Sequence, residues 1–228
     1  MFHVEQTIKK NLRIKRMKRL SALKKIYEVH DEYTKEKHFF CHKGCGSCCT
    51  INLAITSLEA QLILNNIGTS LKCEVEKFIK FERFQPKTTT NGLANIFISG
   101  GEAPDEFMPD NTEKCPFLDR SSSECMIYDI RPLQCRIMLS ISDCGINHEA
   151  ELDEKKITIN SVFQQYVELL DYDGLTGNMI DLLVHGTNPI FTSKFVDNQK
   201  PKALMIPPEF HEMTKPLILK LNSIFNSL

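Results

Sequence analysis

Apolar residues recur at helical spacing in the first part of the chain, where no Gly or Pro interrupts residues 5–37. The apolar positions that would share one side of a helix are Leu12, Leu20, Leu23, Ile26 and Tyr27. Lysines and arginines occupy the other sides. The pattern predicts one long N-terminal helix that docks on the body of the protein and has a basic, solvated face.

Two shorter helices are predicted by local signals that follow. Thr56 and Glu59 have the spacing of a capping box, in which each side chain binds the other residue's backbone N–H. A helix is therefore expected to begin there and to end at Gly68, where glycine can stop it. A second helix is expected at about 70–84, with Cys73 on its solvent side as a free surface cysteine.

The rest of the chain alternates between loops and helical patterns. Residues 86–111 are rich in turn-forming residues and predict loops with one short strand at Asn95–Ser99. Helical patterns return at about 157–170, 177–185 and 208–226. We therefore expect a mainly α single domain with a long N-terminal helix, in which cysteine-bearing loops converge on a metal centre.

Charge divides the chain unevenly. A basic helical arm, residues 1–40, carries 11 Lys/Arg against 5 Asp/Glu, whereas the remainder carries 17 against 24. We divide that remainder into a cysteine-cluster metal-binding region, 41–150, and a C-terminal helical region, 151–228, that packs on it. An acidic body argues against nucleic acid covering the whole surface, and it leaves the arm as the electrostatic candidate for phosphate or membrane contact.

Composition narrows the class of protein. The chain is 42% hydrophobic and 25% charged, and no apolar run approaches the roughly 18 residues that a membrane span requires. The basic N-terminus lacks the apolar segment of a signal peptide, so we expect a cytoplasmic protein. In that reducing compartment, nine clustered cysteines favour metal ligation or redox chemistry over a set of disulfides.

The first cysteine motif, CHKGCGSCC, holds Cys41, Cys45, Cys48 and Cys49. Short loops between these thiols can turn around one ion or cluster, and glycines on both sides of Cys45 allow the backbone to bend closely. Soft thiolates select zinc or iron–sulfur units over hard cations such as magnesium.

The second motif, CPFLDRSSSECMIYDIRPLQCR, holds Cys115, Cys125 and Cys135. Its second proline suits the first turn of a helix that would carry Cys135. Arg131 and Arg136 bracket that thiol, and their guanidinium groups are suited to offset the negative charge of several thiolates. We interpret both arginines as contacts to the cofactor.

Together the two motifs resemble the YkgJ-like cysteine-cluster family. The matching positions are Cys41, Cys45, Cys48, Cys49, Cys115, Pro116, Leu118, Cys125, Ile127, Tyr128, Arg131, Pro132, Cys135 and Arg136. The resemblance covers residues 41–136 and implies a zinc- or iron-chelating protein, with some members described as iron–sulfur oxidoreductases. It implies that the seven motif cysteines are the metal ligands.

Two alternatives for the metal follow from these residues. Seven thiols exceed the four ligands of one structural zinc, which favours an iron–sulfur cluster such as a 4Fe–4S cluster, whereas a closed zinc site would indicate a partner-binding module. Cys144 is a candidate for an added ligand, and His42 is interpreted as a bystander.

A third interpretation is a radical S-adenosylmethionine enzyme. Cys41, Cys45 and Cys48 have the required spacing, and the predicted strand before GGE resembles the cofactor contact of that superfamily. Catalytic residues, and any protein or small-molecule partner, are not indicated by the sequence.

Overall fold

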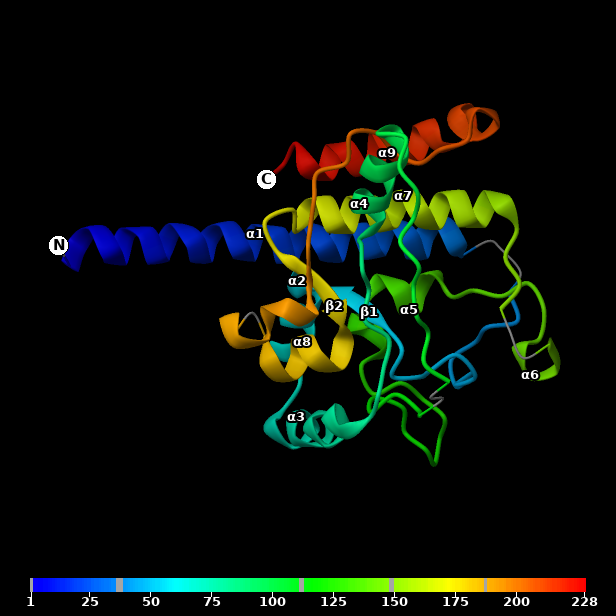
Figure 1. Ribbon diagram of the computed structural model, residues 1–228, viewed down its shortest axis with the longest axis horizontal. Helices are drawn as coiled ribbons and strands as arrows, with labels where there is room; N and C mark the ends of the chain where they lie inside the picture. The colour runs from blue at the N-terminus through cyan, green and yellow to red at the C-terminus, as the bar shows by residue number, and fades with distance from the viewer. Residues whose placement is uncertain (1, 36–38, 111–112, 148–149, 187) are drawn as a thin grey trace.

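Three helices that are distant in the sequence form the first layer of the fold: α1 (Phe2–Thr34), α7 (Glu154–Leu170) and α9 (His211–Phe225). Figure 1 shows them running side by side, and α1 and α7 both pack against α9 as well as against each other. Their apolar faces meet in one core, which includes Leu23, Phe163 and Leu221, each with an exposed fraction of 0%. The prediction of a mainly α domain with a long N-terminal helix is confirmed.

The second layer contains a small antiparallel sheet in the order β1 (Ala54–Thr56), β2 (Leu175–Asn178) and β3 (Val196–Asp197). Ile55 lies opposite Gly177 in this sheet. Helices α2 (Ser57–Leu64) and α8 (Met179–His185) pack against it, α3 (Thr69–Glu76) packs against α8, and together they close a second core. None of the three strands was predicted, because each is short and its partner is distant in the sequence.

The computed structural model describes residues 2–35, 39–110, 113–147, 150–186 and 188–228. Its remaining elements are short and are η1 (Lys77–Lys80), α4 (Thr90–Ile98), η2 (Tyr128–Ile130), α5 (Leu133–Ile137), α6 (Cys144–Asn147), η3 (Pro189–Lys194) and η4 (Pro208–Phe210). Within these described ranges no helix has the length and apolar composition of a membrane span.

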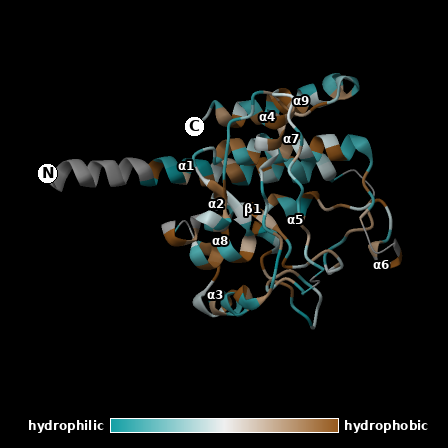
Figure 2. Cartoon of the chain, viewed as in Figure 1, coloured by the Kyte–Doolittle hydropathy of each residue, from teal (hydrophilic) through white to brown (hydrophobic). Residues whose placement is uncertain are grey.

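Helix α1 is docked from about Leu20 onward and exposed at residues 13–18. Leu23 and Ile26 are fully buried and Tyr27 nearly so, whereas residues 13–18 lie at the surface. Hydrophobic and hydrophilic residues alternate along the layer of helices in Figure 2, as expected for helices with one buried face. The predicted side of the helix is therefore the docked one from Leu20 onward, while Leu12 lies where side chains are not described.

Glu59 joins three helices through one buried carboxylate. The predicted capping box is present: Glu59 Oε2 accepts the N–H of Thr56 at 2.9 Å, and the Thr56 hydroxyl caps the backbone of Glu59 in return. Glu59 Oε1 accepts the Tyr27 hydroxyl from α1 and the N–H of Leu133 at the start of α5, both at 2.8 Å. The cap of α2 thus also fixes the helix that carries Cys135.

The predicted strand at Asn95–Ser99 is wrong, because these residues belong to the end of α4. Thr89 caps this helix through the N–H of Gly92. The buried carboxylate of Glu168, on α7, accepts the N–H groups of Thr90 and Asn91 at 2.9 and 2.7 Å. An acceptor at a helix N-terminus stabilises the helix, so a distant residue adds to the local cap from Thr89.

The other predicted helices are present, but the residues at which they begin or end differ from the prediction. The first short helix ends at Leu64, and Gly68 instead caps the start of α3. The α-helix predicted at about 70–84 continues after Glu76 only as the short helix η1, and Cys73 is exposed as predicted.

We predict that Glu59→Gln destabilises the fold by about 2–3 kcal/mol, because an amide nitrogen in place of one oxygen leaves a buried donor without an acceptor. Urea unfolding measures this effect. Tyr27→Phe is the matched control, since it removes a single hydrogen bond of the same carboxylate and should cost about 1 kcal/mol. A Glu59→Gln variant as stable as wild type would contradict the role assigned to this carboxylate.

The second prediction concerns Asp171, which is buried and accepts the Ser57 hydroxyl at 2.6 Å and the N–H of Leu58 at 2.9 Å. Burial raises the pKa of Asp171 to about 6. The folded state therefore holds a proton more tightly than the unfolded state, and stability falls as pH rises from about 4 to 6.

The Asp171→Asn variant isolates this contribution because it does not titrate. Relative to this variant, wild type should lose about 2 kcal/mol of unfolding free energy between pH 4 and pH 7. Urea unfolding at several pH values measures the difference. A difference between the two proteins that does not change with pH would contradict the prediction.

Candidate metal centre

All seven motif cysteines line one cavity beside the second core. They come from two segments far apart in the sequence and are Cys41, Cys45, Cys48, Cys49, Cys115, Cys125 and Cys135. The cavity has a volume of about 120 Å³, equivalent to about four water molecules in the liquid. Its size suits an ion or a small cluster better than an organic substrate, whose pockets measure several hundred Å³.

The first motif folds as two consecutive turns. The N–H of Cys45 donates to the carbonyl of His42 at 3.0 Å, and the N–H of Cys49 donates to the carbonyl of Gly46 at 3.2 Å. Gly44 lies within the first of these turns and has a φ of +92°, a conformation that favours glycine. The predicted bending of this loop is confirmed, and it directs Cys41, Cys45, Cys48 and Cys49 toward the cavity.

Backbone hydrogen bonds join the two motifs beside the thiols. The N–H of Cys115 donates to the carbonyl of Cys49 at 3.0 Å, and Thr50 and Lys114 form a β-bridge. Lys114 also reaches the carbonyls of Gly46 and Ser47 with its ammonium group, at 3.2 Å each. The sequence analysis did not identify this lysine, whose only signal was its position next to Cys115.

The second motif is a hairpin-like loop followed by a helix. Leu118 and Cys125 form a β-bridge, so the two ends of the loop that contains Cys115 and Cys125 lie together. Helix α5 then begins after Pro132 and carries Cys135, as predicted. Its apolar neighbours Leu133 and Ile137 are anchored in the first core.

The local environment favours the protonated form of several cavity thiols. Burial raises the pKa of Cys115 to about 12 and the pKa of Cys135 well above its ordinary value, and neighbouring thiols add to both shifts. A hydrogen bond with Cys49 raises the pKa of Cys48. Because a metal ligand must be a thiolate, metal binding at these positions would release protons.

The two arginines of the second motif have different surroundings. Arg136 is buried and its guanidinium group pairs with Asp31 on α1 at 2.6 Å, donates to the carbonyls of Asp129 and Arg131, and lies over the Tyr27 ring. Arg131 lines the cavity and stacks on Tyr128 at 3.7 Å. One of its nitrogens, Nη1, is buried and has no hydrogen-bond partner among the described residues.

The cavity is suited to a soft metal by its donor set, which consists of thiols. As these side chains are placed in the described ranges, no three His, Cys, Asp or Glu residues are close enough to hold a metal ion. The choice of ligands among the seven cysteines therefore stays a prediction. His42 lines the cavity with its Nδ1 beside the carbonyl of Phe40, and Cys144 is at the start of α6, outside the lining.

Comparison with protein-family models gives one match. Residues 40–161 match the family CxxCxxCC, described as a proposed zinc- or iron-chelating domain. Comparisons with curated proteins and with solved structures found no match. The matched segment contains both cysteine motifs and the helix that follows them, and it spans more than half of the chain. The protein therefore belongs to the CxxCxxCC family of proposed zinc- or iron-chelating domains.

Proposed function

We propose that this protein binds an iron–sulfur cluster through the cysteines of both motifs and acts in redox chemistry. The observation that carries the proposal is the convergence of seven thiols from two distant segments on one small cavity. One structural zinc needs four ligands, whereas seven thiols can supply a cluster and further sulfur contacts. A bound cluster would supply one-electron transfer.

Arg131 supports a negatively charged occupant. Among the described residues its buried Nη1 has no hydrogen-bond partner, and it lies in the wall of the cavity that the seven thiols line. A buried guanidinium donor without an acceptor is costly, and sulfur atoms of a cluster or of its thiolate ligands would satisfy it. Arg131 would thus tune the centre, while Arg136 would hold α5 on α1.

The size of the cavity helps to distinguish an electron-transfer protein from an enzyme whose substrate binds to the cluster. A volume of about 120 Å³ leaves little room for an organic substrate beside a cluster. We therefore favour electron transfer over a reaction in which a substrate binds to the cluster. The radical S-adenosylmethionine interpretation loses one of its two supports, because the segment before GGE is the helix α4; the spacing of Cys41, Cys45 and Cys48 is the support that is left.

Zinc is the second candidate, supported by the family description and by the small cavity. A closed zinc site would make the two motifs a structural clamp. Iron and acid-labile sulfide in protein purified without oxygen would support the cluster, whereas stoichiometric zinc without sulfide would support the clamp. Exclusion of oxygen is essential because thiolate sites that lose iron can bind zinc instead.

We predict that Cys48→Ser and Cys135→Ser each lower metal content by at least about half, because each removes a soft ligand from the shared centre. Elemental analysis of anaerobically purified protein measures metal per chain. Cys73→Ser is the matched control, since Cys73 is exposed on α3 and lies outside the cavity lining. Full metal content in both cavity variants would overturn the convergent site.

We predict further that Arg131→Met lowers the reduction potential of the centre by on the order of tens of millivolts, because it removes a positive charge and a hydrogen-bond donor near sulfur. Spectroelectrochemical titration measures the potential. Arg120→Met is the control, because Arg120 is an exposed arginine of the same motif that pairs with Glu113. Equal shifts in the two variants would contradict a specific role for Arg131.

A further inference from the structure

A second pocket, of about 560 Å³, opens beside η1 and shares no lining residue with the cysteine cavity. Its volume falls in the range of pockets that bind small organic molecules. The basic side chains of its wall come from three segments and are Lys80, Arg83, Lys87 and Lys194, while Glu82 is the acidic residue of that wall. The three lysines of the wall against one glutamate indicate an anionic ligand.

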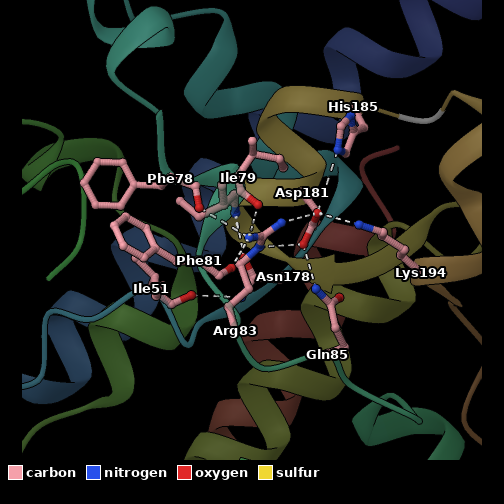
Figure 3. A network of polar contacts seen from close by, with 11 residues as sticks. Ile51, Phe78, Ile79, Phe81, Arg83, Gln85, Asn178, Asp181, His185 and Lys194 are labelled. Atoms are coloured by element: carbon pink, nitrogen blue, oxygen red, sulfur yellow. Dashed lines mark hydrogen bonds and ion pairs between the residues drawn. The ribbon is translucent and has the colours of Figure 1, made fainter. Parts of the chain in front are cut away.

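Arg83 is part of the scaffold of this pocket. Figure 3 shows it against Asp181 of α8, with Nε and Nη2 at 2.8 and 2.6 Å from the carboxylate oxygens. Its Nη1 donates to the carbonyls of Ile79 and Phe81, at 3.0 and 2.6 Å. Every nitrogen of Arg83 is thus engaged, and this side chain fixes η1 on α8.

The charge of Asp181 is largely balanced before Lys194 is considered. Asp181 is fully buried and also accepts the side-chain amide of Gln85 at 2.6 Å. Burial acts to raise its pKa, but the hydrogen bonds from Arg83 and Gln85 lower it, so the carboxylate stays ionised. The Lys194 ammonium lies 3.7 Å away and its side chain is 47% exposed, which leaves it able to bind a ligand anion.

Lys80 and Lys87 add charge at the same opening, and two phenylalanines add an apolar surface. Both lysines are exposed at the surface. The Phe107 side chain is 64% exposed, and the Lys80 ammonium lies 5.0 Å from the centre of the Phe81 ring. Exposed aromatic faces beside cations can stack a planar ring while the cations bind its anionic groups.

We propose that this pocket binds a phosphorylated small molecule that carries a planar ring, of the nucleoside diphosphate class. Lys87 and Lys194 bind the phosphate groups, and Phe107 contacts the ring. This proposal does not depend on the metal centre, because the two cavities are formed by different residues.

The test is isothermal titration calorimetry of the full-length protein with ADP at low salt, where charge interactions are least screened. We expect saturable binding of one ADP per chain. The double variant Lys87→Ser, Lys194→Ser should bind ADP at least about tenfold more weakly, because it removes two charged contacts to phosphate. Lys155→Ser is the matched control, since Lys155 is an exposed lysine of α7 outside the pocket.

Pyrophosphate serves as a second probe to separate the phosphate contacts from the ring contact. Phe107→Ser should weaken ADP binding and leave pyrophosphate binding unchanged. Absence of ADP binding, or equal ADP affinity in wild type and the double variant, would overturn the site. Pyrophosphate binding as tight as ADP binding, with no effect of Phe107→Ser, would overturn the ring contact and with it the nucleotide class.

Discussion

The buried carboxylate of Glu59 is the contact on which the arrangement of the cysteine cavity depends. It accepts hydrogen bonds from α1, from the N-terminus of α2 and from the N-terminus of α5. Each of these donors is buried, so loss of the carboxylate would leave several polar groups without partners at once. Because α5 carries Cys135, the same contact that caps a helix also determines where the second motif meets the first.

The cavity lies beside the second core, and the helix that carries Cys135 continues into the first core. Phe117 and Ile127 anchor the second motif in one core, while Leu133 and Ile137 anchor its continuation in the other. The first motif is attached through the backbone contact between Cys115 and Cys49. Apolar anchoring on both sides explains how loops without regular structure can hold seven thiols around a small volume, a preorganisation that a metal centre requires.

The sequence predicted features that depend on local signals and missed those set by distant residues. Thr56 and Glu59 predicted the capping box because both partners lie within one turn, but nothing near Glu59 indicated its bonds to Tyr27 and Leu133. The buried apolar face of α1 was also predicted, because the spacing of its apolar residues is a local signal. In contrast, the sequence near Asn95–Ser99 gave no sign that Glu168, more than 70 residues away, accepts two N–H groups at the start of the helix α4.

The spacing of the cysteines identified the two motifs in the sequence, and the structure adds that the cysteines of both motifs line one cavity. Spacing alone could not separate Arg131 from Arg136, because only the fold places Asp31 beside the latter. The most direct test of a shared thiolate centre is X-ray absorption at the metal edge of anaerobically purified protein. A first coordination shell made only of sulfur, at about 2.3 Å, with a neighbouring metal at longer distance, is the predicted result. A shell dominated by nitrogen or oxygen would contradict it.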